Sequence, residues 1–182
     1  MSKHPNVLSP TEMENGGFLG ETTQVALVTD DLYGSLDQLI AVGIGPWQVY
    51  KMTPANAELI YRGKPDAYSM KLAFTWHGAM MWEVIEPTDG ESIYQDFLDA
   101  GVKGFHHIIV DCNGIPYEER KAEFEARGFD EIQSGVAFDG NAPFGYFHNG
   151  QPDSPILEIF AYPEGFEPPA PDEWYPSPPP NE

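Results

Sequence analysis

Four polar side chains stand inside apolar stretches of this sequence, where a polar group needs a partner. Glu83 lies within MMWEVIE and Glu158 within ILEIF, while Gln24 and His107 begin the apolar runs QVALV and HIIV. An unpaired carboxylate in such a place costs several kcal/mol of desolvation. Carboxylate and amide oxygens together with an imidazole could instead bind one divalent cation. Residue type alone leaves another interpretation open. The glutamates could face solvent or pair with lysine, and His107 could be a core residue whose hydrogen bonds are satisfied.

Strands are expected to carry all four groups. Apolar and β-branched residues predict a strand, a helix and extended segments in the order 22–29, 32–42, 47–52, 57–62, 68–76 and 79–86. After a short connecting helix at 91–100, the same order returns at 105–111, 116–127, 131–138, 143–148 and 156–160. Gln24 and His107 each begin a run that leads through an Asp into a helix, which indicates a weak internal repeat of 83 residues (107 minus 24).

Composition restricts the class of protein and the kinds of partner. A chain of 182 residues with 41% hydrophobic content can form one compact domain or two fused modules. The only cysteine, Cys112, excludes an intrachain disulfide and a thiolate zinc cluster. A formal net charge of -20, from 9 Lys and Arg against 29 Asp and Glu, argues against nucleic acid as a partner. The absence of a secretory signal and of a long apolar run predicts a soluble, cytoplasmic protein without a membrane partner.

The two ends of the chain differ from the middle. Residues 1–20 are polar and without period, which predicts an N-terminal arm before a domain at 21–162. Residues 163–182 are rich in proline and acids, and because proline removes the donors that a sheet needs, an extended, loosely docked tail is expected. Its Trp174 and Tyr175 could pack on the domain or on a second subunit. No Lys or Arg follows Arg127, so a phosphorylated ligand held by the C-terminal half would depend on backbone amides.

The segments QVALVTDD, MMWEVIEP, FHHIIVDC and ILEIF resemble the vicinal oxygen chelate superfamily, the glyoxalase, bleomycin-resistance and dioxygenase group. The resemblance is closest to its methylmalonyl-CoA-epimerase-like branch. It implies an α+β fold in which two paired βαβββ modules, at about 22–87 and 105–160, form a cupped mixed β-sheet. It also implies that the four polar residues bind one divalent metal ion (Co, Mn, Ni, Mg, Fe or Zn): Gln24, Glu83, His107 and Glu158. Gln24 departs from the family, which commonly has histidine there, and His107 is preferred over His106 because its place matches that of Gln24.

The resemblance implies an activity as well. Epimerases, isomerases and lyases of this group act on small carbonyl-containing substrates through a metal-stabilised enolate. Glu158 is then a catalytic base as well as a ligand, and Asp66 is its expected partner acid, with Tyr68 and His77 as fallback candidates. Two alternatives stay open: a ring-cleaving dioxygenase, which would prefer two histidines and one carboxylate around iron, and a metal-independent protein that sequesters a ligand.

Aromatic residues of the predicted strands indicate the kind of substrate. Trp47, Tyr68 and Trp76 are expected to contact an aromatic or apolar small molecule, although the ordinary fate of strand aromatics is the core. By resemblance, His148 before the last strand supports the same site. The resemblance also leaves a homodimer open, because such proteins form the cup either within one chain or across a dimer.

Overall fold

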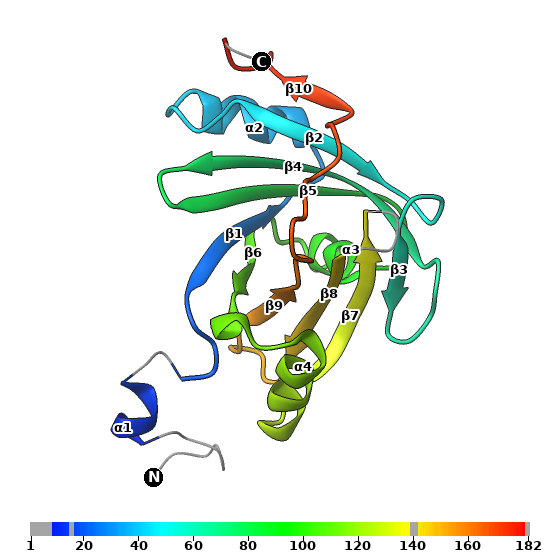
Figure 1. Cartoon of the computed structure of the whole chain (residues 1–182). Helices are drawn as coiled ribbons and strands as arrows, with labels where there is room; N and C mark the ends of the chain where they lie inside the picture. Colours follow the sequence, from blue (N-terminus) through cyan, green and yellow to red (C-terminus); the bar gives the residue numbers. More distant parts are fainter. Residues whose placement is uncertain (1–8, 15–16, 139–141, 181–182) are drawn as a thin grey trace.

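The computed structural model describes residues 9–14, 17–138 and 142–180, and these fold around one curved sheet (Figure 1). The first half consists of β1 (Thr22–Val28), α2 (Leu32–Ile40), β2 (Trp47–Met52), β3 (Glu58–Tyr61), β4 (Tyr68–His77) and β5 (Met80–Gly90). After α3 (Ile93–Asp99), the second half consists of β6 (Gly104–Val110), the short η1 (Cys112–Gly114), α4 (Tyr117–Ala126), β7 (Asp130–Ala137), β8 (Ala142–His148) and β9 (Ile156–Phe160). A short α1 (Pro10–Met13) precedes them and β10 (Glu173–Tyr175) follows.

The ten strands form a single sheet in the order β10-β2-β4-β5-β1-β6-β9-β8-β7-β3. Each half contributes four neighbouring strands in the same arrangement, so the predicted pair of βαβββ modules in an α+β fold is confirmed. The modules meet where β1 pairs with β6 in antiparallel fashion. Within each module the first strand pairs in parallel with the last, β1 with β5 and β6 with β9. The four strands β5, β1, β6 and β9 are therefore adjacent in the middle of the sheet.

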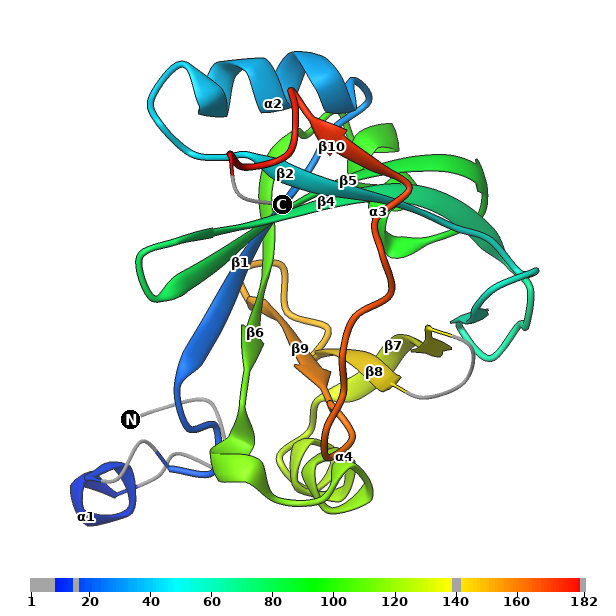
Figure 2. The same ribbon diagram turned by 45° about the horizontal axis from the view of Figure 1, so that its top comes forward.

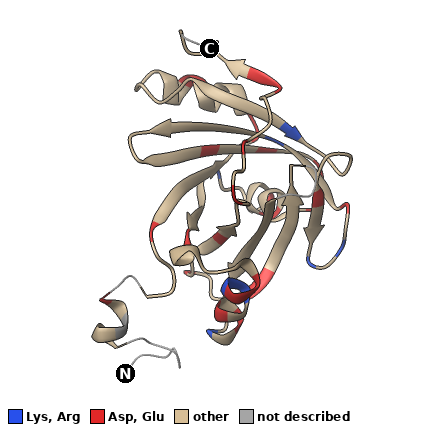
Figure 3. Ribbon diagram, viewed as in Figure 1, with Lys and Arg blue, Asp and Glu red and all other residues tan. Residues whose placement is uncertain are grey.

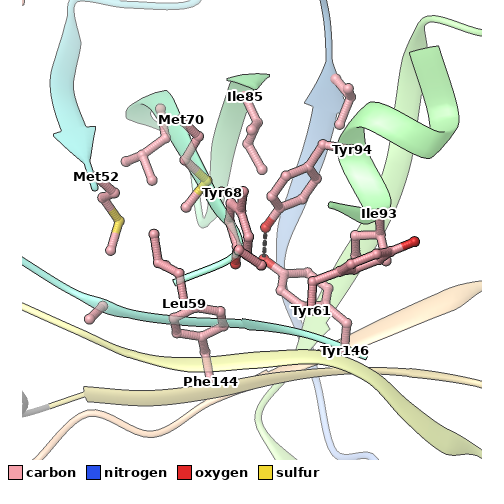
Figure 4. Close-up of a cluster of buried hydrophobic side chains, with 14 of the residues drawn as sticks. Met52, Leu59, Tyr61, Tyr68, Met70, Ile85, Ile93, Tyr94, Phe144 and Tyr146 are labelled. Carbon is pink, nitrogen blue, oxygen red and sulfur yellow. Dashed lines mark hydrogen bonds between the residues drawn. The ribbon is translucent and has the colours of Figure 1, made fainter. Parts of the chain in front are cut away.

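The curvature separates an outer face from an inner one. Helices α2 and α4 lie on the outer face, one on each module (Figures 1 and 2). The side chain of Asp31 caps α2 by accepting from the Gly34 amide, and Leu32 and Leu36 pack against the sheet. The inner face carries a second cluster that includes Met52, Met70 and Phe144 (Figure 4). Among the described residues, no helix has the length and apolar character needed to cross a membrane.

Two segments pair differently from what the sequence indicates. Strand β3, expected within the first module, pairs with β7 of the second, with Glu58 opposite Val136. The C-terminal residues are not simply an extended tail, because β10 adds to the edge of the sheet beside β2. The physical reason is local: the residues of β10 are Glu, Trp and Tyr, which keep their amide donors although prolines flank them.

Candidate metal centre

The four polar residues of the apolar stretches meet on the inner face of the sheet. Gln24, Glu83, His107 and Glu158 come from β1, β5, β6 and β9, the four adjacent central strands. Strand register explains the meeting, because Ala26 of β1 stands opposite both Glu83 and His107. All four side chains are buried, with residue exposures between 1% and 4%. One donor atom from each of Glu83, His107 and Glu158 lies within 4.8 Å of the others.

The donor atoms face one another at short range. His107 Nε2 lies 2.9 Å from Glu158 Oε2 and 3.4 Å from Glu83 Oε2. Gln24 Nε2 donates a hydrogen bond of 2.7 Å to Glu83 Oε2, which leaves the amide oxygen of Gln24 free. Two carboxylates, one imidazole and one amide oxygen are thus gathered in one buried place.

Several of these atoms lack the hydrogen bonds that burial demands. His107 Nε2, Glu158 Oε2 and the amide oxygen of Gln24 are enclosed without a partner of hydrogen-bonding geometry. An unsatisfied buried polar atom costs about 1–3 kcal/mol, and more when it is charged. The arrangement fits a divalent cation, since three oxygens and one nitrogen could satisfy it while two carboxylates neutralise its charge.

The electrostatics of the metal-free site favour bound protons. Burial raises the pKa of Glu158 to about 7, although the adjacent His107 opposes the rise. Burial by itself lowers the pKa of His107, but Glu158 and Glu83 outweigh it and raise that pKa to about 9. A cation that enters the site would replace these protons, because its ligands must be deprotonated.

A cavity of about 580 Å³ begins at these residues. Gln24, Glu83 and Glu158 line one part of it, and most of the remaining wall is formed by apolar and aromatic side chains such as Met70 and Phe144. This size and lining are typical of sites for small organic molecules. The cavity gives the buried donor atoms a space in which a substrate could reach them.

Of the residues expected to contact substrate, the structure places Trp76 at the cavity and the others away from its lining. Trp76 lines the cavity and is 62% exposed. Trp47 does not line it, which corrects the expectation: the side chain is fully buried against α2, and its indole N–H donates to the Ile44 carbonyl at 3.0 Å. Strand alternation is the reason, because Gln48 and Tyr50 of β2 face the cavity and Trp47 must therefore face the other way.

Tyr68, His148 and Asp66 also lie outside the cavity lining. Tyr68 is buried in the inner cluster, edge-to-face with Tyr94 of α3 (Figure 4). His148 ends β8, where its Nδ1 accepts from the Gly150 amide. Asp66 is exposed in the turn before β4 and does not line the cavity, so its role as a partner acid stays a prediction. A loop aspartate carries no sequence signal that separates a solvated turn from a site.

Sequence reasoning missed Tyr146 of β8, which lines the cavity. Tyr146 is the cross-strand neighbour of Glu158, and its ring lies edge-on to His107 at 4.9 Å between centroids. Its hydroxyl accepts a hydrogen bond of 2.7 Å from the Tyr94 hydroxyl (Figure 4). The two-residue period from Phe144 could have identified it, since both side chains share one face of the strand.

His106 lies directly behind the candidate ligand His107. The two Nδ1 atoms are 2.9 Å apart, while His107 Nε2 points at the carboxylates. Phe97 packs edge-on against the His106 ring at 4.8 Å between centroids, and burial, with the adjacent His107, lowers the pKa of His106 to about 3. A neutral His106 that accepts at Nδ1 would hold the His107 proton on Nδ1 and leave Nε2 free for a metal ion.

Replacement of His106 by Phe is expected to lower divalent-metal affinity by about 10–100-fold, the range typical of residues that orient a ligand histidine. His106→Asn should retain most of the affinity, because its side-chain oxygen can accept the same proton. Isothermal titration of Mn²⁺ or Co²⁺ into the three proteins would measure this. Equal affinities for wild type and His106→Phe would show that His106 only fills space.

Comparison with known proteins agrees with the fold. The profile of the Glyoxalase/Bleomycin resistance protein/Dioxygenase superfamily matches residues 23–146, well over half of the chain. No curated protein matches the sequence. The hypothetical protein BH1468 from Bacillus halodurans is similar in structure at 19% identity and a TM-score of 0.59, over 81% of this chain and 98% of that one.

Two methylmalonyl-CoA epimerases are also similar in structure. The enzyme from Mycobacterium tuberculosis has 11% identity and a TM-score of 0.56, over 86% of this chain and 93% of its own. A single-residue variant of the Streptomyces coelicolor enzyme, in complex with 2-nitronate-propionyl-CoA, has 14% identity and a TM-score of 0.58, over 82% of this chain and 99% of that one. At these identities the likeness concerns the fold alone. From the extent of the family match, the chain belongs to the glyoxalase/bleomycin resistance protein/dioxygenase superfamily.

Proposed function

We propose that this protein is a divalent-metal-dependent epimerase, isomerase or lyase that removes a proton beside the carbonyl group of a small, apolar or aromatic substrate. The observation that carries the proposal is the buried meeting of Gln24, Glu83, His107 and Glu158 at the wall of an apolar cavity. Family membership and the likeness to epimerase folds support it. A divalent ion bound by these residues would act as a Lewis acid toward a substrate oxygen.

The protein's own groups supply the remaining chemistry. Glu158 lines the cavity, and its carboxylate can accept a proton from a substrate carbon held against it. Tyr146 stands opposite Glu158 on β8 and packs against His107, so it restricts how both side chains can turn. The apolar wall excludes water and thereby strengthens the electrostatic interactions at the buried end of the cavity.

The test is exchange of substrate hydrogen with solvent. Protein loaded with Mn²⁺ or Co²⁺ would be incubated in D₂O with a panel of ketones, α-keto acids and hydroxy ketones, and deuterium would be measured by mass spectrometry. We expect metal-dependent incorporation at the carbon next to the carbonyl, and its loss in Glu158→Gln. Absence of exchange across the panel, with metal bound, would overturn the proposed reaction.

The donor set distinguishes this proposal from ring cleavage. A dioxygenase of the kind considered would prefer two histidines and one carboxylate, whereas the residues gathered here include one histidine, His107, and two carboxylates. Oxygen uptake with catechols by the iron-loaded protein would favour that alternative over proton abstraction. A homodimer stays a prediction, which sedimentation velocity would check.

A further inference from the structure

The segment that follows β9 crosses the open side of the cup. It leaves the second module at Phe160, passes in front of the inner face and joins the first module as β10 (Figures 1 and 2). There it pairs with β2, with Trp174 opposite Gln48 and Tyr175 opposite Trp47. Residues 163–180, called here the C-terminal segment, therefore connect the two rims of the cup. The family match ends at residue 146, before this segment begins.

Side-chain hydrogen bonds fix the C-terminal segment in place. The Asp172 carboxylate accepts from the Lys51 amide at 2.7 Å, and the Glu173 carboxylate accepts from the Tyr33 hydroxyl at 2.8 Å. On the same face of β10 as Glu173, the Tyr175 hydroxyl donates to Asp37 of α2 at 2.7 Å. Asp172 and Glu173 thus have defined partners on the first module, and a loosely docked tail does not describe the part of the segment around β10.

One side of the C-terminal segment forms part of the cavity. Its lining residues are all apolar: Phe166, Pro168, Trp174 and Pro179. Strand register explains why Trp174 faces inward, because its partner Gln48 lines the cavity, while Tyr175 faces α2 together with Trp47. The Tyr50 hydroxyl, at the cavity wall, donates to the Pro169 carbonyl at 3.1 Å. The cavity therefore extends from the candidate metal ligands to this segment.

The described part of the cavity lining offers no cationic side chain to a negatively charged group. Among the described residues that line it, none is Lys or Arg, and the charged ones are Glu83 and Glu158. Two cations outside the cavity have acidic partners: Lys71 pairs with Glu86, and Lys121 with Glu131. Figure 3 shows no Lys or Arg on the C-terminal segment, which carries acids instead. A phosphate group that entered the cavity from the side of the C-terminal segment would meet carboxylates and apolar rings without a compensating cation.

We propose that the C-terminal segment is the specificity-determining wall of this cavity, and that Trp174 and its apolar neighbours restrict the ligand to an uncharged, largely apolar molecule. A phosphate-rich carrier such as coenzyme A is excluded, because the segment occupies the open side of the cup and supplies no cation. The inference concerns the site of the proposed function and names its substrate class, so it rests on that proposal for its biochemical meaning. The shape and charge of the cavity carry it physically.

Binding of two probe molecules tests whether the C-terminal segment selects for apolar ligands, and it requires no knowledge of the substrate. Nile red, a neutral apolar dye, would be titrated by fluorescence into metal-free full-length protein, and coenzyme A by calorimetry. We expect micromolar binding of the dye and at least 100-fold weaker binding of coenzyme A. Coenzyme A binding as tight as that of the dye, or no dye binding, would overturn the proposal, and this comparison needs no variant.

Two matched variants locate the effect. Trp174→Ala removes the inward side chain of β10 and should weaken dye binding at least tenfold. Tyr175→Phe keeps the outward ring, and the Asp172 and Glu173 hydrogen bonds still hold the segment, so its dye binding should stay as in wild type. Far-UV circular dichroism and thermal melts would establish that both are folded. Unchanged dye binding by folded Trp174→Ala would overturn the role of the wall. Failure of the proposed reaction is seen separately, as absent deuterium exchange, so the two proposals can fail independently.

Discussion

Glu83→Gln is expected to lower the affinity for a divalent metal ion and to raise the stability of the metal-free protein. The metal-free site gathers two carboxylates around one imidazole, all buried. The introduced amide would remove one buried charge, and its oxygen could still accept the hydrogen bond that Gln24 donates to Glu83 at 2.7 Å. We expect the melting temperature of the metal-free protein to rise by about 2–4 °C, the shift that about 1 kcal/mol produces in a domain of this size. Divalent-metal affinity should fall by more than about 100-fold, because even supporting residues contribute 10–100-fold.

Calorimetric melts with and without EDTA, together with metal titration, would measure both effects. For wild type, metal at 100 times its dissociation constant should add about 2.7 kcal/mol of stability. Glu58→Gln is the matched control, because Glu58 is an exposed strand glutamate away from the cavity lining, and both properties should stay as in wild type. Metal affinity that survives Glu83→Gln would contradict the assignment of this ligand.

The stability of the metal-free protein is expected to fall as pH rises from about 5 to about 9. The folded-state pKa of Glu158 is about 7 against a reference of 4.5, and that of His107 is about 9 against 6.5. Both groups therefore bind protons more tightly in the folded than in the unfolded state. The stability they contribute is fully present below the unfolded pKa and is lost as pH rises through the folded pKa.

Urea unfolding at several pH values would measure this slope, with EDTA and with saturating metal. Bound metal displaces the same protons, so the contribution of the site to the slope should disappear in the metal-saturated protein. The double variant Glu158→Gln, His107→Gln isolates the site from the remaining acids of the chain, and its metal-free slope should be shallower than that of wild type. Identical slopes for the two metal-free proteins would contradict the prediction.

Local pattern predicted most of the elements. The strands at 47–52 and 156–160 have the bounds that composition indicates, because apolar and β-branched runs there end at clear turn residues. The helices α2 and α4 differ from the expected ranges only at their ends. The sequence does not predict which strands pair with each other. Nothing in the residues of β3 says that it pairs with β7 of the other module, since an edge strand can add to either rim once the sheet curls.

The substrate-contacting residues show where pattern reasoning failed. Trp47 was expected to contact the substrate, yet residues at odd and even positions of one strand face opposite sides of the sheet. The structure places Tyr50 at the cavity and Trp47 against α2. Aromatic content alone therefore identified the kind of wall, while strand alternation decided which rings form it.

The sequence by itself determined that Glu83, Glu158, Gln24 and His107 stand in apolar strands where each needs a partner, because burial of a polar group is costly wherever it occurs. Only the tertiary structure decided that the four are neighbours, since strand order and register brought β5, β1, β6 and β9 together. It also decided that the proline-rich end lies across the cavity, because the free donors of β10 meet the edge of β2 only in the folded sheet.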